Sequence, residues 1–198
     1  MRVKNCVPMI ALCLLLCGCG KQEQTAENLR AAYQEMSGCE MTAEVICGQS
    51  GLEWSATLQC TYVPGGESVV EVTEPLELAG VRARIREDGW QLEYGDLCLN
   101  AGALTEEAVS PAAALHRMMC ALREGWLLEE NQEKREGVPC TRLALEQTGA
   151  SGGGIVTTVW LRQEDGLPLY GEISVDGETI LSARFTDFTF CDTITAHS

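Results

Sequence analysis

Basic residues are scarce in this sequence. Lysine and arginine together number 14 against 29 aspartate and glutamate residues, and histidine occurs only twice, at His116 and His197. A surface of this charge repels phosphate backbones and anionic lipid headgroups. The composition therefore excludes nucleic acid as a partner, and it excludes attachment to a membrane through a basic patch.

Residues suited to catalysis or metal binding are also sparse. We expect His116 on a helix and His197 near the end of the chain to be solvated, since neither has an evident acid or nucleophile partner. No CxxC pair or zinc-like spacing follows Cys19. Residues 149–153 match the GxSxG motif, but a nucleophile elbow leads into a helix, whereas a strand is predicted here. We therefore predict no catalytic residue, no metal site and no cofactor.

No apolar run is long enough to span a membrane as a helix. The longest, residues 6–16, is continuously apolar for about a dozen residues, whereas a transmembrane helix needs ~20. It follows Arg2 and Lys4 and precedes a segment with small and polar residues. These features are typical of a signal peptide that is removed on export.

The residues that end this segment resemble the bacterial lipobox. Leu16 stands three positions before Cys19, and Gly18 directly precedes that cysteine. The resemblance implies that residues 1–18 are the signal peptide, and that Cys19 becomes the first mature residue and carries diacylglycerol. Two acyl chains anchor a protein stably, which predicts a protein held at the extracytoplasmic face of the cell membrane. Cys17 is disfavoured as the acceptor because Leu16 precedes it; a plain signal peptide or a buried amino-terminal helix remains the alternative.

The predicted mature chain has the size of one domain. Residues 19–24 form the lipidated cysteine and a short tether, and residues 25–198 form a single domain. Its 12 basic and 29 acidic residues give a net charge of −17. Seven cysteines follow Cys19, an odd number that cannot pair completely within a monomer, and we expect most to be small core residues: Cys39, Cys47, Cys60, Cys98, Cys120, Cys140 and Cys191.

Hydrophobic periodicity predicts two helices and a series of strands. Apolar residues recur at helical spacing over 25–36, and again after the Ser110-Pro111 start signal until Gly125. Alternating or apolar runs predict strands over residues 40–47, 53–62, 68–73, 81–85, 90–94, 138–145, 155–161, 169–175 and 179–190. Successive hairpins with segregated helices indicate an α+β fold, a curved antiparallel sheet of about eight or nine strands with helices covering its concave face.

This layout resembles the LolA and LolB superfamily of lipoprotein carriers and receptors. The resemblance covers most of the mature chain and includes the Glu74-Pro75 step, the hairpin at 88–94, Leu167-Pro168 and the aromatic segment 185–190. It extends to the branch of germination lipoproteins related to GerS. It implies an unclosed half-barrel whose concave apolar face holds acyl chains in several relatives. A carrier must be soluble, so an anchor at Cys19 favours a receptor-like or regulatory role.

One sheet face and the second helix supply candidate apolar residues. These residues either line a site for an acyl or lipoprotein ligand or form a filled core, and the sequence leaves both open. They are Trp54, Leu58, Tyr62, Val70, Val72, Leu92, Tyr94, Leu115, Met118, Met119 and Leu122. The expected function is a non-enzymatic binding module for that ligand or for an envelope partner. The alternatives are a regulatory or structural lipoprotein, for example in sporulation or germination, and an envelope enzyme.

The first hairpin predicts that two cysteines are neighbours. If residues 48–51 form a four-residue loop, Cys39 lies opposite Cys60, and every apolar side chain of one strand meets an apolar side chain of the other. A slip of one residue would turn the apolar face outward, whereas a slip of two preserves this match.

Overall fold

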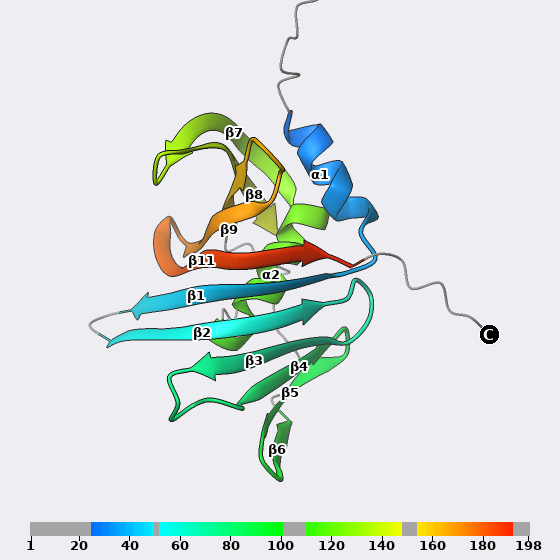
Figure 1. The fold of residues 1–198 in the computed structure, drawn as a ribbon, viewed down its shortest axis with the longest axis vertical. Helices are drawn as coiled ribbons and strands as arrows, with labels where there is room; N and C mark the ends of the chain where they lie inside the picture. The colour runs from blue at the N-terminus through cyan, green and yellow to red at the C-terminus, as the bar shows by residue number, and fades with distance from the viewer. Residues whose placement is uncertain (1–24, 50–51, 101–109, 148–153, 192–198) are drawn as a thin grey trace, which may run out of the picture.

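The computed structural model describes residues 25–49, 52–100, 110–147 and 154–191 (Figure 1). The predicted signal peptide, Cys19, residues 149–153 and His197 lie outside the described residues, so predictions about them stay predictions. The helices are α1 (Ala26–Glu35) and α2 (Ala114–Glu124), and the 3-10 turn η1 (Pro111–Ala113) precedes α2. The strands are β1 (Cys39–Gln49), β2 (Leu52–Tyr62), β3 (Ser68–Glu74), β4 (Arg82–Arg86), β5 (Gly89–Tyr94), β6 (Leu97–Asn100), β7 (Trp126–Arg135), β8 (Val138–Gln147), β9 (Ile155–Arg162), β10 (Pro168–Val175) and β11 (Glu178–Phe190).

All the described strands form one antiparallel sheet. Its order is β6-β5-β4-β3-β2-β1-β11-β10-β9-β8-β7, so the first strand pairs with the last at the centre. The sheet is curved and unclosed, with β7 and α1 at one end and β6 at the other (Figure 1). The α+β half-barrel architecture is therefore confirmed.

The predicted number of strands was too low, because the described residues contain eleven. The two missed strands, β6 and β7, are the edges of the sheet. All four residues of β6 are exposed, and so are most residues of β7. A strand shows an alternating pattern only when one of its faces is buried, and neither edge strand has a well-buried face.

The first helix forms where the sequence predicts it. Thr25 is its N-cap, and the Thr25 hydroxyl accepts a hydrogen bond from the Asn28 backbone N–H at 3.4 Å. Tyr33 is fully buried: its hydroxyl donates to the Gly166 carbonyl at 2.7 Å, and its ring packs edge-on against Phe190. These contacts attach α1 to the end of β11 and to the loop before β10.

The second helix covers the concave face of the sheet. It contacts β2 and β3 on one side of the sheet centre and β8, β9 and β10 on the other. The approach is closest at Gly171 of β10, where a Cβ atom would lie 2.6 Å from Met118 Sδ. Glycine at this position lets the helix lie directly on the sheet.

The predicted register of the first hairpin is wrong by two residues. Cys39 lies opposite Tyr62, and Cys60 lies opposite Met41, so the two cysteines are diagonal neighbours and do not face each other directly. The pairing continues to Gln49 opposite Leu52, two residues closer to the turn than expected. Alternation cannot detect this error, because a shift of two residues keeps every side chain on its face. The seven described cysteines are all free thiols.

Candidate functional site

The interface between α2 and the sheet is filled by side chains. Leu115, Met118, Met119 and Leu122 of α2 have no accessible surface, and Leu58 beneath them has none either. A void large enough for water would leave accessible surface on the side chains that line it. The centre of the concave face is therefore a packed core in the described residues, and of the two possibilities that the sequence left open, it is the core that forms here.

The other candidate residues lie progressively further from this core. Tyr62, Val70 and Val72 are buried on β2 and β3. Trp54 and Leu92 are half-buried and pack against the core cluster from its margin. Tyr94 is 52% exposed, so it does not belong to the core. The predicted set thus divides into a packed centre and an open margin.

That open margin is a continuation of the concave face beyond α2. Residues directly opposite in adjacent strands share a face, and one such row runs from the centre of the sheet to its β6 edge. The row consists of Met41, Cys60, Val70, Ala83, Leu92 and Leu99. Exposure is 1% at Met41, 2% at Ala83 and 65% at Leu99. The apolar surface of the sheet therefore extends beyond the part that α2 covers.

We call Leu92, Tyr94, Leu97 and Leu99 the uncovered edge. Tyr94 lies opposite Leu97, which is 73% exposed, and Leu92 lies opposite Leu99. Sequence reasoning missed Leu97 and Leu99, although a Leu-x-Leu pair directly after the Gly95-Asp96 turn is a hairpin signal. Contiguous exposed apolar residues on one sheet face are typical of an interaction surface.

His116 is half-buried and packed against other side chains, so the prediction of a solvated histidine is wrong. Its Nε2 atom lies 3.4 Å from Cys120 Sγ one turn along α2, and its ring packs edge-on against Tyr62. The Tyr62 hydroxyl lies 3.6 Å from the same sulfur. The i,i+4 spacing of His116 and Cys120 was the available sequence signal; the position of Tyr62 on β2 was not visible in the sequence.

This trio, with Tyr62 buried and His116 and Cys120 half-buried, is built of neutral groups. Burial, with a contribution from Arg117, lowers the pKa of His116 to about 4. Burial raises the pKa of the Cys120 thiol, and burial together with Cys120 raises that of the Tyr62 hydroxyl. A nucleophilic cysteine needs a lowered pKa. The trio therefore has the electrostatics of a packed polar cluster and not of an activated thiol.

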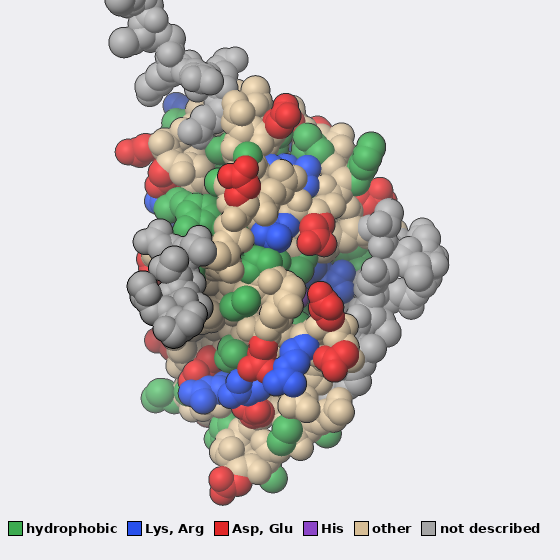
Figure 2. All heavy atoms as spheres, turned by 90° about the vertical axis from the view of Figure 1, so that its right-hand side faces the viewer, with side chains coloured by type: hydrophobic (Ala, Val, Ile, Leu, Met, Phe, Trp, Pro, Cys, Tyr) green, Lys and Arg blue, Asp and Glu red, His purple; other side chains and the backbone are tan. Residues whose placement is uncertain are grey.

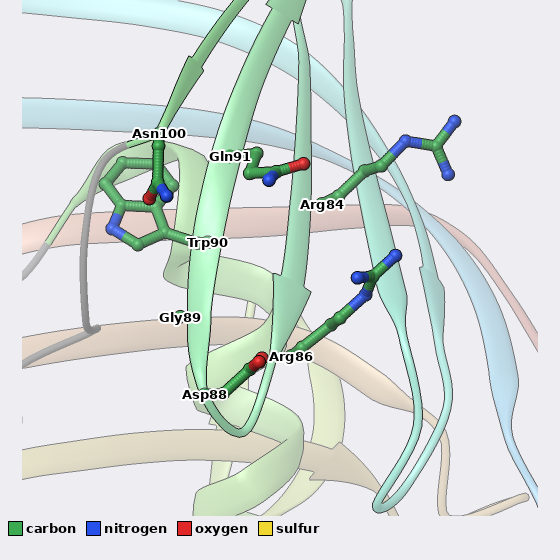
Figure 3. Close-up of a pocket in the computed structure, with 7 residues that line it drawn as sticks. All are labelled: Arg84, Arg86, Asp88, Gly89, Trp90, Gln91 and Asn100. Carbon is green, nitrogen blue, oxygen red and sulfur yellow. The ribbon is translucent and has the colours of Figure 1, made fainter.

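A small pocket of about 90 Å³ lies on the β4–β6 hairpins and is lined by charged and polar residues (Figure 3). The guanidinium groups of Arg84 and Arg86 point away from Trp90 in this view. Both arginines are paired with Glu67, Arg84 at 2.6 Å, and Arg84 also bonds Glu93 at 2.9 Å. On the face in Figure 2, basic side chains likewise lie among acidic ones. Because these cations are already paired, the pocket is poorly suited to an anionic ligand.

Two further features bear on the class of protein. Among the residues that the structure describes, no three His, Cys, Asp or Glu side chains are grouped as metal ligands would be. The described helices are too short or too polar for any of them to cross a bilayer.

No protein-family model and no curated protein matches the sequence. A domain from Vibrio parahaemolyticus described as an outer membrane lipoprotein-sorting protein superposes with a TM-score of 0.51 at 14% identity, over 86% of this chain and 93% of that one. A DUF1329 family protein from Desulfovibrio piger superposes with a TM-score of 0.52 at 10% identity, over 87% of this chain and 95% of that one.

At these identities the similarities show the fold alone. The chain shares the fold of the Vibrio domain described as lipoprotein-sorting, as the predicted resemblance implies for the architecture. The germination-related branch is not confirmed and stays a prediction.

Proposed function

We propose that this protein is a membrane-anchored, extracytoplasmic lipoprotein that acts as a binding module and not as an enzyme. Its ligand is apolar, an acyl chain or an apolar segment of an envelope protein, and it binds at the uncovered edge. The observation that carries the proposal is the apolar row that leaves the core at Ala83 and ends at Leu99, with exposure rising from 2% to 65%.

The position of this surface supports a binding role. A single exposed leucine is ordinary on a protein surface, but four neighbouring apolar side chains on one face of a hairpin are a patch. The patch is continuous with the concave face, and its outer strand β6 ends the sheet in the described residues. A ligand can therefore contact both the apolar side chains and the edge strand that carries them.

A binding experiment on the chain from residue 20 onward tests the proposal. A fluorescent fatty acid and a diacylated cysteinyl peptide are titrated separately, with the unacylated peptide as the reference. We expect the acylated probes to bind and Leu99→Glu to weaken binding at least about tenfold, because burial of one leucine is worth ~1.5–3 kcal/mol. Cys98→Ser is the matched control, since Cys98 is exposed on the same strand with its side chain on the other face.

The results separate the possibilities. Equal binding by the Leu99→Glu and Cys98→Ser variants would exclude the uncovered edge as the site. The unfolding midpoints of both variants in urea should match that of the unaltered chain, since both positions are exposed.

The filled interface under α2 favours a second candidate, a regulatory or structural lipoprotein whose partner is another protein. Because the centre of the concave face is packed, an acyl chain has no interior space beside Leu58 or Met118. An extended protein segment needs only the edge of β6 and its exposed leucines. A photo-crosslinking residue at position 99 in cells should then give one discrete protein adduct, whereas position 176, in the exposed turn between β10 and β11, should give none.

A further inference from the structure

Trp126 and Leu128 form a second exposed apolar surface, at the opposite end of the sheet from the uncovered edge. Their exposures are 72% and 50%. Leu127 between them packs against the core, opposite the buried Leu145. Trp126 lies opposite Glu146, and its side chain therefore points away from the core.

This surface lies beside the start of the domain. The Ala26 backbone N–H, at the first residue of α1, donates to Glu130 Oε1 at 2.8 Å. One turn further along α1, Arg30 Nη2 donates to the Gly125 carbonyl at 2.7 Å. Residues 125–130 therefore run along the first turn of α1, with Trp126 and Leu128 between the two contacts.

The predicted lipid on Cys19 is a short distance away along the chain. Five residues, 20–24, separate Cys19 from Thr25, a span of at most ~20 Å when fully extended. A domain held this closely must turn the surface around α1 toward the bilayer. Tryptophan prefers the membrane interface, where its ring is buried and its N–H finds a polar partner.

Two of the neighbouring carboxylates are already engaged, which lowers the electrostatic cost of such a contact. Glu129 forms an ion pair with Arg142 at 2.8 Å and accepts a hydrogen bond from Asn131. Glu130 accepts the Ala26 N–H. The acidic composition still disfavours anionic headgroups, so the surface fits a zwitterionic interface.

We propose that Trp126 and Leu128 insert into the headgroup region of the bilayer that holds the anchor and thereby orient the domain. This inference rests on the proposed lipid anchor at Cys19. It places β7 at the membrane and β6 at the far end of the sheet, as Figure 1 shows for the two edges. The uncovered edge then faces away from the anchoring membrane, where a ligand or partner can reach it.

Fluorescence of the full lipidated protein in phosphatidylcholine vesicles tests the insertion. Vesicles with brominated acyl chains should quench tryptophan emission relative to unbrominated vesicles, and Trp126→Phe should abolish this quenching. Trp90→Phe is the matched control, because Trp90 is half-buried near the opposite edge and should leave the quenching unchanged. Leu128→Ser should reduce the quenching.

The outcomes distinguish this inference from the anchor itself. Vesicle flotation reports the anchor: protein that floats while the bromine quenching is absent, or persists in Trp126→Phe, overturns the insertion and leaves the anchor intact. Protein that does not float overturns both. Alternatively, Trp126 emission shifts to the blue without vesicles, by an amount that grows with protein concentration. That result would assign this surface to contact with a second copy of the chain and would also overturn the proposal.

Discussion

Arg30 and Arg123 each hold the carboxyl-terminal end of the helix that carries the other. Arg30 of α1 donates from Nε to the Leu122 carbonyl at 2.9 Å and from Nη2 to the Gly125 carbonyl at 2.7 Å. Arg123 of α2 donates from Nη1 to the Tyr33 carbonyl at 2.9 Å. The last carbonyls of a helix lack partners within it and carry partial negative charge, so a guanidinium satisfies both needs. The reciprocal contact joins α1 to the helix that fills the concave face.

Loss of either arginine should destabilise the domain. A hydrogen bond to a charged group contributes about 1.5–3 kcal/mol, so Arg30→Met and Arg123→Met should each lower the free energy of unfolding by about that amount. Because both join the same two helix ends, the double variant should lose less than the sum of the single losses. Urea unfolding followed by circular dichroism measures this. Arg184→Met is the control, since Arg184 is half-exposed in its pair with Glu136 and should change stability far less than either helix arginine.

Acid should destabilise the protein partly through His116. The folded pKa is about 4, because burial and then Arg117 oppose the charged form, whereas an unfolded histidine titrates near ~6.5. As the pH falls from about 6.5 to about 4, the unfolded chain takes up a proton that the folded chain does not, and stability is lost across that window. Between pH 7 and pH 5 the loss from this residue should be about 2 kcal/mol.

His116→Gln isolates this effect, because the carboxylates titrate equally in both proteins. The variant should lose less stability than the unaltered protein between pH 7 and pH 5 in urea unfolding. Identical losses would show that His116 is accessible to protons in the folded state.

The free thiols should react in order of exposure. Cys98 is exposed, whereas Cys39, Cys60 and Cys140 are buried. Burial raises the pKa of Cys39 to about 12 and that of Cys60 as well, so these thiols are protonated at neutral pH. Maleimide labelling followed by mass spectrometry should show one fast site, absent in Cys98→Ser, and the three buried thiols should react only on unfolding. A fast phase that survives in Cys98→Ser would contradict this assignment.

The lipid anchor should depend on Cys19. Cys19→Ser should release the protein from the membrane fraction, because no thiol remains to carry diacylglycerol at that position, and the signal peptide should stay uncleaved or be cleaved elsewhere. Fractionation and gel mobility measure both effects. Cys17→Ser is the matched control and should behave like the unaltered protein; the opposite pattern would make Cys17 the acceptor.

Local patterns in the sequence determined most of the secondary structure. The Thr25 cap and the spacing of Leu29 and Tyr33 predicted α1, and Ser110-Pro111 and Gly125 delimited the second helical segment. All nine predicted strands are present. Most of these elements were predictable because they bury one face, and one-sided burial leaves a period in the chain.

Tertiary structure alone decided the features that have no local signature. The edge strands β6 and β7 lack a well-buried face and hence a period. The register of β1 against β2 differs by two residues from the prediction. The alternating pattern fits both registers equally well, because a shift of two residues keeps each side chain on the same face of the sheet. The burial of His116 against Tyr62 joins residues 54 positions apart, and no spacing on either element encodes it.

At the candidate site too, some features follow from the sequence and others only from the tertiary structure. The sequence by itself determined which residues are apolar and on which face of each strand they lie, because a side chain's face follows from its position in the alternation. Only the tertiary structure decided which part of that face is filled and which is open. Helix α2 covers Leu58 and leaves Leu99 exposed to solvent. The boundary between the covered and the exposed part depends on packing between segments far apart in the chain.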